Sequence, residues 1–104
     1  MIPRNRVATH PGKILKSDYV EHLDLDQKEF ADHLGISRKH LNNILNEKAA
    51  VTPEMAVKLG AALDTSAEYW MNLQKAHELS KAQIETKKSR LPKILPELKT
   101  AMSS

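Results

Sequence analysis

The chain has 104 residues, which is enough for one domain with a modest hydrophobic core and hardly enough for a second. It contains no cysteine, which excludes disulfide bonds and metal sites built on thiolates. Sixteen Lys and Arg residues against thirteen Asp and Glu give a net charge of +3, too small an excess to indicate a nucleic-acid partner by itself. Aromatic residues make up only 4% of the chain, whereas Ala, Leu, Lys and Glu are abundant, so we expect an all-α fold.

The ends of the chain differ in character from its middle. Residues 1–9 carry Arg4 and Arg6 without periodic apolar positions and predict a flexible arm. Residues 10–82 hold nearly all of the patterned apolar residues and are expected to form one domain. Residues 83–104 combine basic side chains with prolines, which predicts a basic tail that is extended or partly disordered. Because no apolar run reaches the length of a membrane span and the N-terminal residues lack the apolar stretch of a signal peptide, we expect a cytoplasmic protein without membrane contact.

Start and stop signals divide the middle of the chain into five helices. The first begins at Pro11, whose ring suits a first helical turn. Its expected inward-facing residues are Ile14, Leu15 and Tyr19. The second begins at Asp26, where Asp26 and Glu29 can cap each other's amides, and it ends at Gly35, which suits a left-handed position.

The three remaining helices have comparable start signals. Ser37 caps the third helix. Thr52 and Pro53 open the fourth, and Ser66 opens the fifth. The apolar residues of the fourth helix repeat at helical spacing: Met55, Ala56, Leu59, Ala62 and Leu63. Those of the fifth helix are Tyr69, Trp70, Leu73 and Ala76, a spacing more typical of a core than of a partner-binding surface.

The second and third helices are joined by a very short turn. The helix that ends at Leu34 is followed by Gly35 and Ile36, and Ser37 already caps the next helix. A turn this short that contains a glycine sets two helices at a steep angle, as in a helix-turn-helix motif. In that motif the second helix enters the major groove of DNA while the first crosses the backbone. The spacing therefore predicts a helix-turn-helix.

The two sides of the third helix differ in polarity. At about 100° per residue, Leu41, Ile44 and Leu45 fall on one side and predict its buried face. The opposite side carries no negative charge and consists of Lys39, Asn42, Asn43 and Asn46, flanked by Arg38 and His40. Asn can pair with adenine and Arg or Lys with guanine, while Ser37 and Gln27 are placed to hold phosphates. The alternative is an ordinary solvated helix face, and the turn spacing favours DNA binding over it.

The residues around this turn also resemble a known family. Residues 27–37 (QKEFADHLGIS) and 41–46 (LNNILN) look like the Xre-type helix-turn-helix of phage repressors. Residues 10–15, 45–56 and 68–74 resemble, in the same order, three blocks of the HigA antitoxins, which are also called VapI. The departures from the pattern are Glu47 where glycine is frequent, Lys13 where Glu is common and Ala67 where Pro is common.

The resemblance implies an antitoxin of a type II toxin–antitoxin module that neutralises a HigB-type, mRNA-cleaving toxin and represses its own operon. It implies a homodimer, and a twofold dimer predicts a palindromic operator with half-site centres about 34 Å apart. The positions that commonly touch DNA in the family are matched by Gln27, Ser37, Arg38, Lys39, Asn42, Asn43, Asn46 and Lys48. We expect the dimer surface to come from the fifth helix and the residues after it. The alternative is a stand-alone Xre-type transcription regulator without a toxin partner, whereas an RNA-binding or structural adaptor would leave the polar side of the third helix unexplained.

Other kinds of site find little support in the sequence. The five histidines are scattered, and only His33 and His40 lie near each other, without a third ligand. The chain shows no nucleophile arrangement, glycine-rich phosphate loop or carboxylate pair at useful spacing. We therefore expect no enzyme activity, cofactor, metal or small-molecule ligand. His10, next to Pro11, is interpreted as a helix-start residue rather than a catalytic one.

Overall fold

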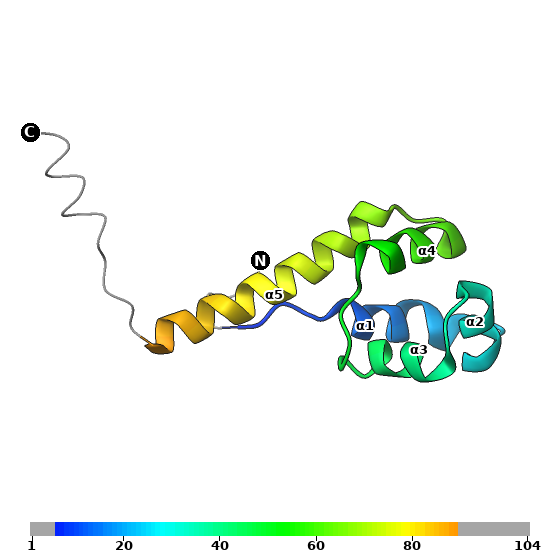
Figure 1. Ribbon diagram of the computed structural model, residues 1–104, viewed down its shortest axis with the longest axis horizontal. Helices are drawn as coiled ribbons and strands as arrows, with labels where there is room; N and C mark the ends of the chain where they lie inside the picture. Colours follow the sequence, from blue (N-terminus) through cyan, green and yellow to red (C-terminus); the bar gives the residue numbers. More distant parts are fainter. Residues whose placement is uncertain (1–5, 90–104) are drawn as a thin grey trace, which may run out of the picture.

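The computed structural model describes residues 6–89, which form an all-α fold, as expected from the sequence (Figure 1). Its elements are α1 (Pro11–Ile14), the π-helix η1 (Leu15–Tyr19), the 3-10 helix η2 (Val20–His22), α2 (Gln27–Leu34), α3 (Arg38–Leu45), α4 (Pro53–Leu63) and α5 (Ala67–Ser89). No strand occurs within residues 6–89. None of the helices in this part of the chain is long and apolar enough to cross a membrane.

The predicted starts of the last four helices are confirmed. At each start a side-chain oxygen accepts a hydrogen bond from the amide three residues further on, which satisfies one of the amides that lack a helical partner. The acceptor–donor pairs are Asp26–Glu29 at 2.8 Å, Ser37–His40 at 3.0 Å, Thr52–Met55 at 3.3 Å and Ser66–Tyr69 at 3.0 Å. The predicted end of the second helix is confirmed as well, because Gly35 adopts the left-handed conformation with φ 69°.

The first helix starts as predicted but does not continue as a regular α-helix. His10 caps it, since its Nδ1 accepts a hydrogen bond from the Gly12 amide at 2.9 Å, so the interpretation of His10 as a helix-start residue is confirmed. After Ile14 the backbone widens into the π-helix η1 and then tightens into the 3-10 helix η2. Side-chain spacing alone does not distinguish these helix types, and the packing of the helix against the core decides between them.

The core is built from buried side chains of η1, α2, α3, α4 and α5. Its largest member is Trp70, which is fully buried and donates from Nε1 to Thr65 Oγ1 at 2.8 Å. The ring of Tyr19 packs 5.6 Å from that of Trp70, measured between centroids. Trp70 is thus a core residue, as expected. Tyr69 is not, because its ring contacts Trp70 edge-on from the surface and remains 39% exposed.

The fifth helix is longer than the sequence analysis expected. Residues 83–89, which the sequence predicts to be extended or partly disordered, continue α5 as a helix, so the prediction is wrong for this segment. The physical reason is that residues 83–89 contain no Pro or Gly, and the first strong helix breaker is Pro92. This end of α5 projects beyond the packed body of the fold (Figure 1). The remainder of the predicted tail, residues 90–104, lies outside the described residues.

The N-terminal arm is attached to α5 where it enters α1. The amide of Ala8 donates to Ser80 Oγ at 2.8 Å, and the Ala8 carbonyl accepts from His77 Nδ1 at 2.8 Å. Ser80 Oγ in turn donates to the carbonyl of His77 at 3.0 Å. Ala8 is also buried, so this part of the predicted flexible arm is held in place. Residues 1–5 lie outside the described residues.

Candidate nucleic-acid interface

The helix α3 is set against α2 by a turn that two backbone hydrogen bonds close. The amide of Gly35 donates to Asp32 O at 3.1 Å, and the amide of Ile36 donates to Ala31 O at 3.0 Å. This is the Schellman arrangement, in which a left-handed glycine closes one helix and turns the chain sharply. Ser37 then caps α3 at once, so the predicted helix-turn-helix is confirmed.

The apolar side of α3 is buried, as predicted from its sequence. Leu41 and Ile44 are completely inaccessible, and Leu45 is 4% exposed. A second contact comes from α1, where Gly12 lies directly on the backbone of α3. A Cβ atom at Gly12 would stand only 1.8 Å from Ile44 O, so no other residue fits there without moving a helix. The buried apolar side of α3 and its contact with Gly12 together fix the position of α3 relative to the rest of the fold.

The loop after α3 is closed by the carbonyl of Asn43. This oxygen accepts hydrogen bonds from the amides of Lys48 at 2.8 Å and Ala49 at 3.1 Å. A closure this tight requires a residue in the left-handed conformation between Asn43 and Lys48, and Glu47 has φ 62°. The conformation explains why glycine is frequent at this place in the family that the sequence resembles. The loop leaves the Lys48 side chain exposed beside the end of α3.

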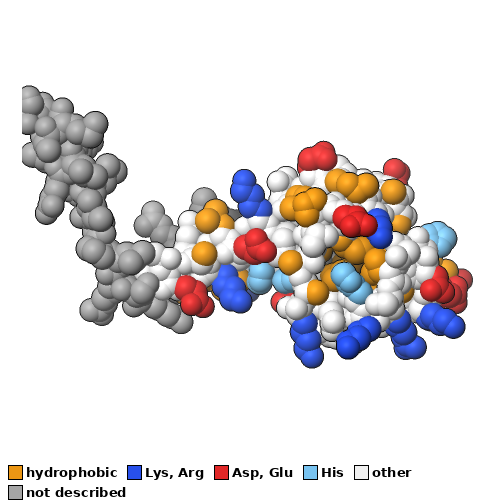
Figure 2. All heavy atoms as spheres, viewed as in Figure 1, with side chains coloured by type: hydrophobic (Ala, Val, Ile, Leu, Met, Phe, Trp, Pro, Cys, Tyr) orange, Lys and Arg blue, Asp and Glu red, His pale blue; other side chains and the backbone are white. Residues whose placement is uncertain are grey.

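The sequence-predicted site residues lie on three adjoining pieces of the chain: the start of α2, the outer side of α3 and the loop after α3. Six of them are exposed: Ser37, Arg38, Lys39, Asn42, Asn46 and Lys48. Gln27 and Asn43 are partly buried. Figure 2 shows Lys and Arg side chains along the edge of the body where α3 lies in Figure 1. None of the residues of α3 is acidic, so its outer side presents cations and amides together.

Two hydrogen bonds refine the picture of this surface. The Ser37 hydroxyl accepts a bond from the α3 backbone and keeps its proton to donate to a phosphate. On the same helix, Asn46 Nδ2 donates to Asn42 Oδ1 at 3.1 Å, which joins two of the predicted base-contacting side chains. The spacing of four residues permits such a bond but does not require it.

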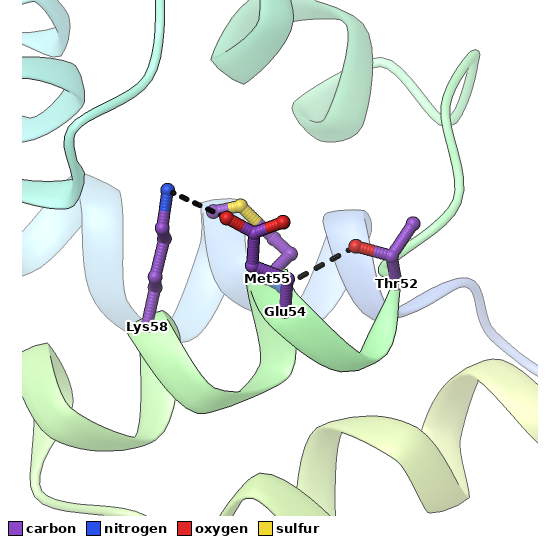
Figure 3. Close-up of polar contacts among 4 residues, drawn as sticks. All are labelled: Thr52, Glu54, Met55 and Lys58. Atoms are coloured by element: carbon purple, nitrogen blue, oxygen red, sulfur yellow. Dashed lines mark hydrogen bonds and ion pairs between the residues drawn. The ribbon is translucent and has the colours of Figure 1, made fainter.

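A hollow of about 200 Å³ lies behind α3, between the helix-turn-helix turn and α4. It is lined by Ile36, His40, Thr52, Glu54, Met55 and Lys58. Figure 3 shows two polar contacts among its lining residues. Lys58 Nζ lies 3.6 Å from Glu54 Oε1, and Thr52 Oγ1 caps α4 through the Met55 amide. No group of three or more potential metal ligands occurs among the described residues.

Comparison with known proteins agrees with this geometry. Residues 18–70, which include α2, α3 and α4, match the family described as helix-turn-helix. The chain belongs to the helix-turn-helix family. This helix-turn-helix protein is 39% identical over 74 residues to the HTH-type transcriptional regulator YbaQ of Escherichia coli K12, a match that covers 71% of this chain and 66% of YbaQ.

Two further relatives carry the name that the sequence resemblance indicated. Antitoxin HigA-1 of Vibrio cholerae is 34% identical to the helix-turn-helix protein over 65% of this chain and 64% of its own length. The structure of Pseudomonas aeruginosa antitoxin HigA with the higBA promoter aligns with a TM-score of 0.76 and 31% identity over 84% of this chain and 98% of that chain. The resemblance to the Xre-type and HigA proteins is therefore confirmed. The chain spans only about two thirds of the length of YbaQ and of HigA-1.

Proposed function

We propose that this helix-turn-helix protein is an antitoxin that neutralises a HigB-type, mRNA-cleaving toxin and represses its own operon by binding a palindromic operator as a homodimer. The observation that carries the proposal is the outer side of α3, where amide and cationic side chains are exposed without an acidic residue on the helix. The likeness to a HigA antitoxin bound to promoter DNA supports the same reading of this surface.

Each predicted site residue has a proposed role on DNA. The side chains proposed to contact base edges are Arg38, Lys39, Asn42, Asn43 and Asn46. The phosphate contacts are assigned to Gln27 at the start of α2, to the Ser37 hydroxyl as a donor, and to the exposed Lys48. Two copies of α3 would then enter successive turns of the major groove on one side of the DNA.

The second candidate is a stand-alone transcription regulator without a toxin partner. The similarity to YbaQ, which is described as a transcriptional regulator, favours it. Both candidates require the DNA face of α3, so DNA binding alone does not separate them. A toxin encoded beside this chain would separate them.

The deciding experiment is co-expression with the neighbouring reading frame. If the protein is an antitoxin, expression of the neighbour alone arrests growth, co-expression restores it, and the two proteins co-purify. The double variant Lys39→Ala/Asn43→Ala should lose operator binding but still restore growth, because we propose that the protein neutralises the toxin through a surface other than its DNA-binding face. A neighbour that is harmless when expressed alone would favour the stand-alone regulator.

A further inference from the structure

Two amide side chains on the outer side of α3 form one hydrogen-bonded unit. Asn46 Nδ2 donates to Asn42 Oδ1 at 3.1 Å, and both residues are exposed. Asn42 lies in the last full turn of α3, and Asn46 is the C-cap residue, with its backbone amide bonded to the Asn42 carbonyl at 3.0 Å. The two residues are thus joined through both backbone and side chain.

The side-chain bond decides which way each amide group faces. Because Asn42 Oδ1 is the acceptor, the Asn42 Nδ2 group keeps both of its protons for a partner outside the protein. Asn46 keeps its carbonyl oxygen as a free acceptor. An unpaired Asn rotates broadly about its terminal torsion and presents donor and acceptor in either order. The pair instead presents one defined order, donor at Asn42 and acceptor at Asn46.

This order matches the chemistry of a base-pair edge. Adenine offers an N7 acceptor beside an N6 amino donor in the major groove, and an Asn amide in the right orientation pairs with both. Asn42 keeps a second lone pair on Oδ1, so the bond from Asn46 does not prevent a bidentate contact. The Asn46 carbonyl can meanwhile accept from an amino group of a neighbouring base. Removal of water in the groove would strengthen the bond between the two amides.

We propose that Asn42 and Asn46 read the operator as a coupled pair, in which Asn46, besides its own base contact, fixes the amide orientation of Asn42. The proposal rests on the proposed operator-binding function and adds that base preference at two positions depends on one side-chain hydrogen bond. If the two side chains contacted bases independently, each substitution would remove one base contact and leave the other unchanged. A coupled pair loses most of its selectivity when either member is removed.

The test is a double-mutant cycle on a duplex that the wild-type protein selects from a randomised library. Asn42→Ala and Asn46→Ala should each weaken binding roughly 10-fold, and the double variant should bind at least about 3-fold better than the product of the two losses predicts. The matched control pairs Asn43→Ala with Asn46→Ala. No side-chain hydrogen bond between Asn43 and Asn46 is found in the described chain, so these two losses should multiply.

A second readout separates positioning from simple contact. Repeated selection with Asn46→Ala should relax base preference at two positions, the one under Asn46 and the one under Asn42. Asn46→Asp should change the preference under Asn42 rather than relax it, because a carboxylate can only accept and would draw the Asn42 Nδ2 group toward itself. Both variants should unfold at the wild-type denaturant midpoint, since the Asn46 side chain is exposed.

Losses that multiply in the Asn42/Asn46 cycle, or relaxed preference at a single position, would overturn the coupling while leaving operator binding intact. Failure of the wild-type protein to select any sequence would instead overturn the proposed function, and the coupling with it.

Discussion

At the scale of single residues, Glu47 combines backbone strain with an unfavourable charge. Its φ of 62° lies in the left-handed region, which costs an L-residue about 1–2 kcal/mol. Its carboxylate also lies just beyond the end of α3, a helix that has cationic and neutral side chains but no acidic ones. The left-handed conformation is needed at this position because the Lys48 and Ala49 amides reach Asn43 O only when the backbone turns in this way.

We predict that Glu47→Gly raises the free energy of unfolding by about 0.5–1 kcal/mol. Glycine relieves the backbone strain, and its greater flexibility in the unfolded chain offsets part of that gain. Urea titration measures this change. Glu47→Gln is the matched control, because it removes the charge and keeps the strain. Both variants should bind DNA more tightly than the wild type, but only the glycine variant should be stabilised. Equal stability of the two variants would contradict the prediction.

Lys48 supports a second prediction at this scale. Its side chain is exposed on the loop after α3, where we propose that it meets a phosphate. Lys48→Ala should weaken binding to all sequences alike and lower the slope of log K against log salt by about 1. A salt titration on the selected duplex and on random DNA measures both effects. A slope that stays at the wild-type value would show that Lys48 does not contact the phosphate backbone.

At the scale of elements, α1 controls the position of α3 through Gly12, whose role cannot be recognised from the neighbouring sequence. We predict that Gly12→Ala lowers the free energy of unfolding by about 1–3 kcal/mol, because its Cβ would overlap the Ile44 carbonyl and force α1 away from α3. Gly35→Ala is a useful comparison, since a Cβ at Gly35 would only touch the flexible end of Lys58 at 4.0 Å, and its cost would come from the left-handed φ. Gly12→Ala should therefore also weaken DNA binding beyond its effect on stability. A neutral Gly12→Ala variant would contradict the close packing of the two helices.

The start of α1 also makes stability depend on pH. Burial lowers the pKa of the His10 imidazole, and the neighbouring His77 lowers it further, while Glu47, a hydrogen bond with the backbone of Ala49, and Glu78 act in the opposite direction. The neutral ring is required because Nδ1 accepts from the Gly12 amide. A folded pKa below the unfolded value of about 6.5 means that the unfolded chain binds more protons in this range.

We therefore predict that the contribution of His10 to stability is complete above about pH 6.5 and is lost as the pH falls through its lowered folded pKa. Urea unfolding of the wild type and of His10→Gln between about pH 5 and 8 measures this contribution, because the titrating groups that do not interact with His10 cancel in the difference. The variant should lose less stability than the wild type on acidification. Parallel pH profiles for the two proteins would contradict the prediction.

At the scale of the whole molecule, the charged groups are unevenly distributed. Lys and Arg side chains follow the edge along α3, whereas the edge formed by α4 and the start of α5 carries Asp and Glu among hydrophobic side chains (Figure 2). The acidic residues on these elements and the turn between them are Glu54, Asp64 and Glu68. If DNA binds along the α3 edge, as we propose, protein contacts fall to the other surfaces of the molecule.

The projecting end of α5 is the part that we expect to join two subunits. Truncation after Ser80 keeps the hydrogen bonds of Ala8 with His77 and Ser80 but removes this end, so the fold should remain while dimerisation is lost. Operator affinity should then fall steeply, because each subunit holds a single half-site. Light scattering and operator titration measure both, and truncation after Ser89 is the matched control that keeps all of α5. A truncated protein that still dimerises would place the interface elsewhere.

Local chemistry in the sequence was sufficient to locate most of the helices. Asp26, Ser37, Thr52 and Ser66 are caps whose partners lie three residues away, so their bonds depend on neighbouring residues alone. The same is true of Gly35, which has no Cβ to oppose a left-handed turn. The polarity of α3 also follows from helical spacing, which is why its buried residues were predicted correctly and the candidate DNA face could be named.

The features that escaped the sequence analysis depend on residues far apart in the chain or on a choice between equally allowed local states. Ala8 meets Ser80 only after the domain has folded, and Gly12 meets Ile44 O only once α1 packs on α3. The widening of the first helix at η1 and the surface position of Tyr69 are seen only in the folded chain, where the rings of Tyr19 and Tyr69 both contact Trp70. The sequence by itself determined where the helices start and which side of α3 is polar, because those properties arise within one or two helical turns. Only the tertiary structure decided how α1 and the arm brace α3 and α5, because those contacts form between segments that the chain brings together from a distance.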